Sequence, residues 1–220
     1  MKNKIFTALF IVALSLFIIT FSIALPIYCR FFYYLQINAL NLPETTGYSF
    51  EQIKGAYDQV LNYLTLPNRP FGTGVFYCSQ DGASHFADCK VLFNLNLTLL
   101  ITSSVILLLT FILKKRGWIT LCRPFSMHPA FVSAFSILAL IIIIAVFAVI
   151  DFTSVFVVFH LIFFPNKTNW QFDARETEII IALPEQFFMN CAILIGVSIL
   201  TFCLSIIIVQ VVKRKKNHIQ

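Results

Sequence analysis

The sequence predicts a mainly α-helical integral membrane protein, a four-helix transmembrane bundle under an extracytoplasmic cap of short helices and some β-structure. Three observations carry this prediction. Four apolar stretches are each long enough to cross a bilayer as a helix, which takes roughly 20 residues. Only 12% of the 220 residues are charged, whereas soluble domains average about 25%. Basic residues also collect beside the ends of the apolar stretches.

The predicted spans are, in order, Ile5–Ile27, Val91–Leu113, Pro129–Ile150 and Phe187–Val212. They belong to a single membrane domain, in which residues 28–90 and 151–186 form the cap. The first span has an alternative interpretation as a cleaved signal peptide. We favour a membrane span, because its apolar core of about 20 residues exceeds that of a signal peptide and no A-x-A cleavage site follows.

The placement of charge predicts the orientation of the chain. Ten of the sixteen basic residues lie beside the same ends of the spans, and all ten acidic residues lie on the other side or at its edge. Basic loops stay in the cytoplasm, so both termini are expected there. The net charge of +6 is therefore a topology signal, and we expect no nucleic-acid partner. The basic residues are Lys2, Lys4, Lys114, Lys115, Arg116, Arg123, Lys213, Arg214, Lys215 and Lys216.

The first cap segment contains one clear helix signal. Ser49 and Gln52 have the spacing of a capping box, and apolar residues then recur at helical intervals as far as Leu64. Residues 75–77 are expected to form a short strand. Cys78 and Cys89 lie on the oxidising side, where they either form a disulfide or remain free thiols.

The second cap segment begins within an apolar stretch that is too long for a single membrane span. Residues 129–164 form a 36-residue stretch that only Asp151 and His160 interrupt, which is longer than one span needs. We expect the part after Asp151 to form an interfacial helix or a re-entrant turn that ends at Pro165 and Asn166. Trp170 suits the membrane interface.

Two histidines are the candidate catalytic groups. His85 should lie in the first turn of the second long helix, with Asp81 or Ser84 as N-cap, and Asp88 follows on the same face. Imidazole titrates near neutral pH, which suits acid–base catalysis. Each histidine alone is also explained as an amphipathic interfacial residue. Because both fall at the outer leaflet, we expect the two rings to line one cavity.

Other chemistries find little support in the sequence. It contains no H-E-x-x-H zinc motif, no G-x-S-x-G nucleophile elbow, no phosphate-binding loop and no dinucleotide fingerprint. We therefore expect no metal and no cofactor, and no covalent intermediate on the protein.

Five motifs in fixed order resemble the lipoprotein intramolecular transacylase (Lit) family of Gram-positive bacteria, and together they cover most of the chain. They are Tyr48-Ser49-Phe50-Glu51, His85-Phe86-Ala87-Asp88-Cys89-Lys90, the run from Phe159-His160 to Pro165-Asn166, Trp170-Gln171-Phe172, and Pro184-Glu185-Gln186-Phe187-Phe188. One departure is Cys89, where the family pattern favours an apolar residue such as Val.

The resemblance implies an acyltransferase of the bacterial cell membrane. Its substrate would be a diacylated lipoprotein, whose sn-2 acyl chain moves to the α-amine of its own N-terminal cysteine and leaves a lyso-form. It also implies that His85 and His160 are the acid–base catalysts, at the outer leaflet. Candidates for orienting groups, oxyanion stabilisation or substrate binding are Asp88, Lys90, Asn166 and Trp170. The remaining expected partner is membrane lipid, and the chain is expected to be a monomer.

Two other functions fit the same composition. A non-catalytic tetraspan sensor or scaffold would depend on its cap surface and tolerate loss of both histidines. A metal-dependent membrane hydrolase would need His85, His160 and a carboxylate to converge on one ion.

Overall fold

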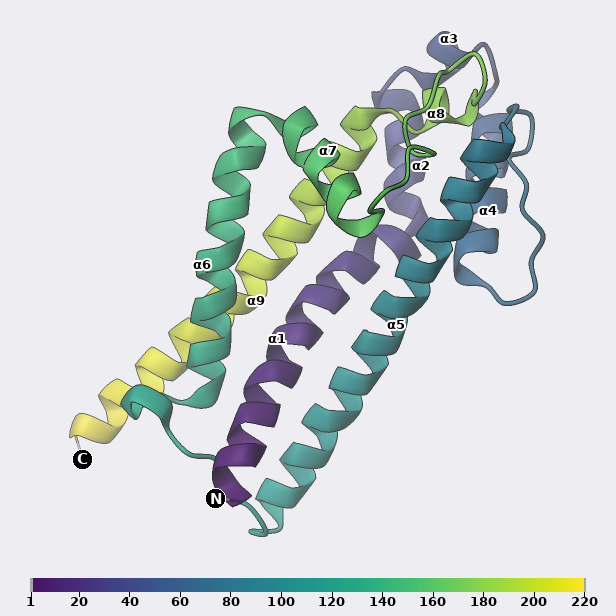
Figure 1. Cartoon of the computed structure of the whole chain (residues 1–220). Coiled ribbons are helices and arrows are strands. Elements are labelled where there is room, and N and C mark those ends of the chain that lie inside the picture. The colour runs from purple at the N-terminus through teal and green to yellow at the C-terminus, as the bar shows by residue number, and fades with distance from the viewer. Residues whose placement is uncertain (1, 220) are drawn as a thin grey trace. The chain divides into compact units, whose positions relative to one another are not determined.

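The computed structural model describes residues 2–219, with side chains from Asn3 to Lys215. This part of the chain is mostly helical (Figure 1). Four helices are long and apolar enough to cross a membrane, which confirms the predicted fold class. The elements are α1 (Lys2–Tyr28), α2 (Arg30–Ala39), α3 (Leu42–Thr46), α4 (Phe50–Thr65), α5 (Gln80–Lys115), the 3₁₀ turn η1 (Pro124–Ser126), α6 (Pro129–Ile150), α7 (Phe152–Phe163), α8 (Ile179–Ala182) and α9 (Glu185–Ile219).

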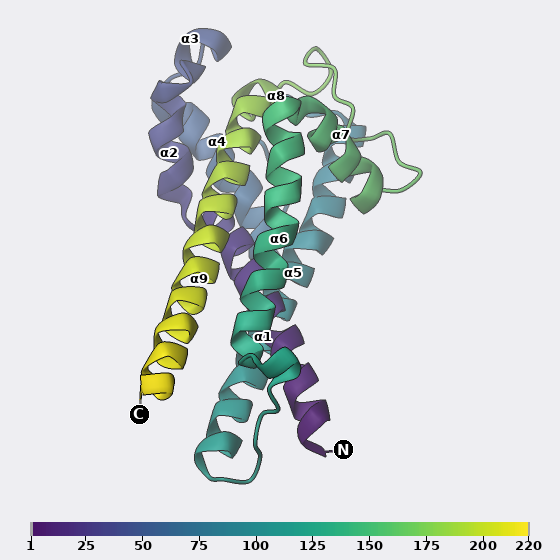
Figure 2. The same cartoon turned by 90° about the vertical axis from the view of Figure 1, so that its left-hand side faces the viewer.

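The chain divides into two compact units, of which the first is built from the four long helices. It comprises Met1–Ala24, Asn96–Val146 and Leu194–Gln220, and Figure 2 shows α1, α6 and α9 from the side. Its buried residues are small or β-branched, so the backbones can approach closely. The core of this unit consists of Ile18, Ala134, Ile137, Ile199 and Cys203.

Polar side chains join the helices of this first unit. The Ser22 hydroxyl lies 3.0 Å from that of Ser198, and the Asn96 amide donates to the Thr20 carbonyl at 3.2 Å. In lipid the hydrophobic effect does not draw helices together, so such hydrogen bonds and close packing hold a bundle.

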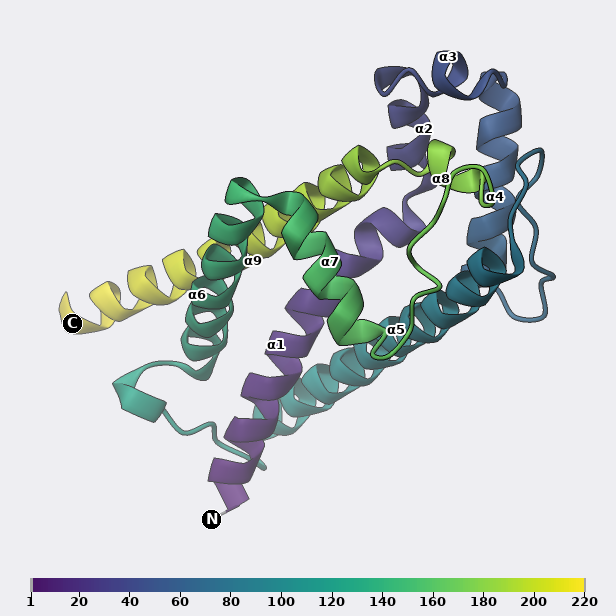
Figure 3. The ribbon, with the colours of Figure 1, turned by 45° about the horizontal axis from the view of Figure 1, so that its top comes forward.

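The second unit, Leu25–Leu95 and Phe147–Ile193, contains the cap. Its core combines aromatic and aliphatic side chains of α2, α4 and α8, among other elements, and Figure 3 shows the ribbons of these three helices. Tyr33 is fully buried, stacks on Tyr57 with ring centroids 3.8 Å apart, and donates from its hydroxyl to the Ala182 carbonyl at 2.7 Å. One side chain therefore connects three helices of the cap.

The capping-box prediction is confirmed. The Ser49 hydroxyl accepts from the Gln52 amide, and the Gln52 side chain accepts from the Ser49 amide at 2.9 Å. The helix that follows buries its apolar face, including Ile53, Val60 and Leu64. These two reciprocal bonds satisfy amide groups that a helix start otherwise leaves without partners.

The expected strand at residues 75–77 is wrong. These residues form a turn and a bend, and the β-structure of the described cap is one isolated antiparallel bridge between Cys78 and Thr177. Thr73 explains the turn, because its hydroxyl donates to the Phe76 carbonyl at 2.6 Å and curls the chain back on itself. All six cysteines are free thiols, so Cys78 and Cys89 do not form a disulfide.

Helix α5 begins earlier than the sequence indicated. Its N-terminus is capped by Ser79, whose hydroxyl accepts from the Gly82 amide at 3.1 Å, and neither Asp81 nor Ser84 takes that role. His85 therefore lies in the second turn of α5, not the first, and the helix dipole acts on it less strongly. Thirty-six residues make a helix about 54 Å long, longer than the roughly 30 Å of a hydrocarbon core.

The apolar surplus after α6 forms a separate short apolar helix, α7. Asp151 ends α6 and caps α7 by accepting from the Ser154 amide at 3.1 Å. The helix ends at Phe163, and Asn166 then adopts a left-handed conformation with φ of 62°. That turn sends the chain back toward α8 along the side of α5 (Figure 3).

Candidate active site

Two buried imidazoles lie side by side in the second unit. His85 comes from the second turn of α5 and His160 from the last turn of α7. Their ring centroids are 5.7 Å apart with the ring planes 31° from parallel, and each residue is only 6% exposed. The structure therefore brings the two candidate histidines together across 75 positions of sequence.

One hydrogen bond fixes the tautomer of His160. Its Nδ1 lies 2.7 Å from the Phe156 carbonyl oxygen, and a carbonyl can only accept, so Nδ1 carries the proton. In the neutral ring the lone pair is then on Nε2. Burial lowers the pKa of His160 below its ordinary value, although the bond to Phe156 acts in the opposite direction. At neutral pH the ring is therefore uncharged and able to take a proton.

His85 has one partnered and one unpartnered nitrogen. Its Nε2 lies 3.4 Å from the thiol of Cys89, one helical turn further along α5. Its Nδ1 is buried and has no hydrogen-bond partner among the described residues. Such an atom costs stability unless a hydrogen-bond partner binds to it. The rings of Phe164 and Phe172 pack edge-on against this imidazole.

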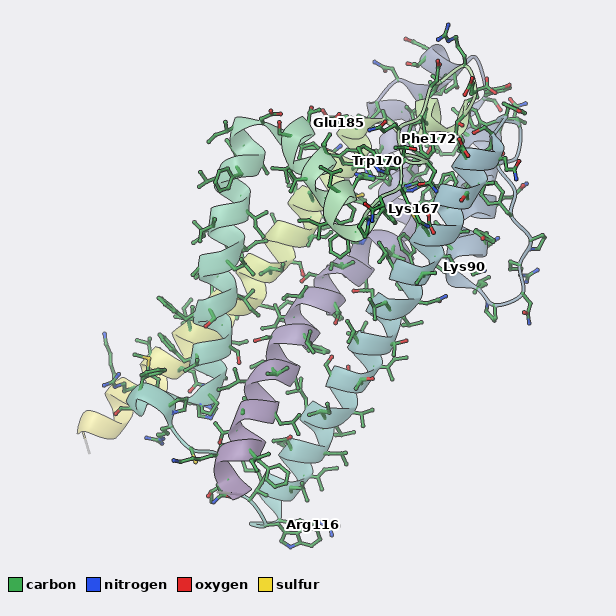
Figure 4. The ribbon with its side chains drawn as sticks, in the orientation of Figure 1. Lys90, Arg116, Lys167, Trp170, Phe172 and Glu185 are labelled. Atoms are coloured by element: carbon green, nitrogen blue, oxygen red, sulfur yellow. The ribbon has the colours of Figure 1, made fainter. Side chains whose placement is uncertain are left out.

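A nine-residue segment covers both histidines, and we call residues 165–173 the strap. Figure 4 labels Lys167, Trp170 and Phe172 on it. Trp170 stacks on His160 with centroids 4.7 Å apart, and Phe172 lies 5.4 Å from His85. A cover of this kind excludes water and lowers the local dielectric constant, which strengthens electrostatic interactions beneath it.

Two polar side chains fasten the strap to α5. Lys167 forms an ion pair with Asp88. Asn169 donates to Asp88 Oδ2 at 3.1 Å and to the Ser84 hydroxyl at 3.2 Å. Ser84 and Asp88 stand on either side of His85 in the sequence, so the strap is attached beside the imidazole.

The other predicted candidates lie in different surroundings. Asp88 is bonded to the strap, and the structure shows no hydrogen bond from it to the His85 ring. The Lys90 ammonium lies 4.2 Å from the ring centroid of Tyr63, because five residues turn a helix by about 140° away from His85. Asn166 is the left-handed turn residue that begins the strap. Trp170 contacts His160 directly.

Several site residues escaped the sequence analysis. Lys167 and Asn169 are polar residues in a loop, and no local spacing connects them with a motif 80 positions away. Their one signal was position, since they lie between the predicted helix end at Pro165 and the predicted Trp170. Among residues 2–219, no group of three or more His, Cys, Asp or Glu side chains is arranged to hold a metal ion.

Fold and site together define an integral membrane protein that holds a covered imidazole pair at the start of a membrane-length helix. A family model for the lipoprotein intramolecular transacylase Lit matches residues 8–188. The chain therefore belongs to this family, whose members are acyltransferases. No curated protein matches the sequence.

Solved structures show the same fold. The lipoprotein intramolecular transacylase Lit from Bacillus cereus superimposes with a TM-score of 0.87 at 22% sequence identity, covering 100% of this chain and 99% of that one. A variant of that protein with an H85R mutation gives 0.78 at 22% identity, covering 99% and 94%. Its H85A variant gives 0.77 at 23% identity, covering 98% and 96%.

Proposed function

We propose that this protein moves the sn-2 acyl chain of a diacylated lipoprotein to the α-amine of that lipoprotein's own N-terminal cysteine. The observation that carries the proposal is the covered imidazole pair, 5.7 Å between ring centroids, in a member of the transacylase family. Each ring has at least one nitrogen without an oxygen partner among the described residues, and an acyl transfer from oxygen to nitrogen needs two proton movements at one place.

In this mechanism the substrate brings its own nucleophile. The neutral amine attacks the ester carbonyl, and the lone pair on His160 Nε2 takes a proton from the attacking nitrogen. His160 passes this proton to the neighbouring His85. The protonated His85 then gives it to the glyceryl oxygen as the carbon–oxygen bond breaks and the carbon–nitrogen bond remains. The proton that leaves nitrogen is therefore the one that reaches oxygen, and both imidazoles end neutral, as they began. Tethering of amine to ester supplies a high effective concentration, so the enzyme need only position the groups and move protons.

The site is placed, in this proposal, at the outer leaflet of the bacterial cell membrane with both chain termini in the cytoplasm. The clusters of basic residues at the C-terminal ends of α5 and α9 support this orientation. Thr46, in α3, then lies outside. In a cysteine-free background, a cysteine introduced at Thr46 is expected to react with an impermeant maleimide on intact cells. Labelling that requires permeabilised cells would reverse the topology.

We also propose that the chain acts as a monomer on a substrate held in the membrane. The aromatic side chains of α7 and the strap supply an apolar surface for acyl chains. Phe156, Phe159 and Phe164 all contact the His160 ring.

The mass of the product tests the reaction. Expressed in a host that leaves its lipoproteins diacylated, the protein is expected to give N-terminal lipopeptides of unchanged total mass, with one acyl chain now amide-linked. A hydrolase would remove an acyl group, and an acyltransferase with a separate donor would add one. A scaffold would leave the ester linkage as it was. Any of these three results would exclude the proposed reaction.

A further inference from the structure

The strap places a lysine ammonium on the carboxylate nearest to His85. Asp88 follows His85 by three residues, on the same face of α5. Its partner Lys167 is accessible, with 45% of its side chain exposed, whereas the Asp88 side chain is 21% exposed. The cation can therefore leave into solvent while the anion stays beside the imidazole.

A second acceptor stands beside this carboxylate without a partner. The Asn169 nitrogen donates to Asp88, so the amide orientation is fixed, because a carboxylate only accepts hydrogen bonds. The Asn169 oxygen is therefore not the atom that contacts Asp88. It is fully buried and has no hydrogen-bond partner among the described residues. A buried carbonyl oxygen of this kind is satisfied only by an N–H or O–H donor.

We propose that Asp88 and Asn169 form a binding subsite for the α-ammonium group of the substrate's N-terminal cysteine, and that Lys167 occupies this subsite until the substrate displaces it. The inference rests on the proposed function and names how that function recognises its nucleophile. An ammonium has three donors. One replaces the Lys167 contact to Asp88, one binds the orphan oxygen of Asn169, and one remains for an imidazole nitrogen. The bound group must lose one proton before it attacks.

Exchange of the substrate's ammonium group for that of Lys167 at Asp88 also favours release of the product. An α-amine is charged near neutral pH, with an ordinary pKa of about 7.7–8.0, whereas the amide formed by acylation carries no charge. The product therefore loses its attraction to Asp88, and the Lys167 ammonium returns. Asp88 is a positioning residue in this scheme, since it holds the amine and takes no part in proton transfer.

The kinetics of two variants separate this scheme from one in which the Lys167–Asp88 ion pair only holds the strap in place. With a synthetic diacylglyceryl-cysteinyl peptide in proteoliposomes, Asp88→Asn is expected to raise KM about 10- to 100-fold with little change in kcat, because one charge-assisted contact is lost. Lys167→Met removes the competing ammonium and is expected to lower KM. The control Arg175→Met breaks an exposed ion pair to Asp173, the last residue of the strap, and should alter neither constant.

The two variants are expected to change KM in opposite directions, and this makes the test decisive. If Lys167→Met raises KM or lowers kcat as Asp88→Asn does, the ion pair only holds the strap, and the proposal is wrong. Should Asp88→Asn fail to fold, Asn169→Leu keeps the volume and removes the orphan acceptor, together with the two hydrogen bonds that Asn169 donates to Ser84 and Asp88. It is expected to raise KM about 3- to 10-fold, since one neutral hydrogen bond to the substrate is lost. An unchanged KM in that variant would equally overturn the subsite.

A binding measurement separates this inference from the proposed function. In a His85→Asn background, which blocks turnover, the peptide with a free α-amine is expected to bind more tightly than the same peptide N-acetylated, and Asp88→Asn should abolish the difference. If the unmodified protein fails to convert the peptide, the proposed function fails. If it converts the peptide but shows no preference for the amine, only the ammonium subsite fails.

Discussion

Replacing His160 with asparagine is expected to reduce formation of the amide-linked lipopeptide by about 10²- to 10⁴-fold, the usual contribution of a general acid or base. Asparagine keeps a polar side chain that can still approach the Phe156 carbonyl, but it cannot accept and release a proton near neutral pH. The same loss is expected for His85→Asn. Mass spectrometry of lipopeptides from cells that produce equal amounts of each variant measures the effect.

Two further variants sharpen this result. His128→Asn is a matched control, because this histidine lies before α6 in the other unit and packs against Phe10. It should retain full conversion. The double variant of His85 and His160 should be little worse than either single one, because groups that act as one unit do not contribute additively. Full conversion by both single variants would show that neither imidazole moves the proton.

Replacing Tyr33 with alanine is expected to destabilise the cap by about 3–5 kcal/mol, the range for truncating a fully buried aromatic residue. The change removes the ring stacked on Tyr57 and leaves the Ala182 carbonyl without its donor. Amide hydrogen exchange reports such local stability. Protection of the α4 amides should fall about 10²-fold or more, since 1.4 kcal/mol corresponds to a factor of ten.

The conservative change Tyr33→Phe separates the two contributions. It keeps the stacked ring and removes only the hydroxyl, so about 1–2 kcal/mol of the loss should remain. Amides of α6, in the other unit, serve as the internal reference and should keep their protection in both variants. If Tyr33→Ala leaves the α4 amides as protected as before, the cap is not organised around this ring.

The fold could be predicted from the sequence because its main signals are local. Apolar stretches of membrane length gave the four long helices, and the Ser49–Gln52 spacing gave α4. The start of α5 was misplaced because three polar residues, Ser79, Asp81 and Ser84, are all competent N-caps. Only the packing around Thr177 and Cys78 selects the first of them, and that packing is not local.

The site was predicted in part. Both histidines were identified by their position where apolar helices begin or end, and their shared depth suggested one cavity. Lys90 was grouped with His85 because the two are close in sequence, but helical geometry turns it toward Tyr63. The strap depends on a backbone reversal at Asn166 and on contacts with Ser84 and Asp88. Contacts between residues so far apart in the sequence leave no periodic pattern from which they could be predicted.

The stacking of Trp170 on His160 has an optical consequence. The chain has two tryptophans, and the other, Trp118, is 63% exposed and lies beside Arg116. In a conformation with the strap lifted, the indole of Trp170 would lose a ring 4.7 Å away and meet water, so its fluorescence emission would move to longer wavelength. In a Trp118→Phe variant the shift in emission would come from Trp170 alone. The fluorescence of Trp170 would therefore report opening of the strap without an added dye.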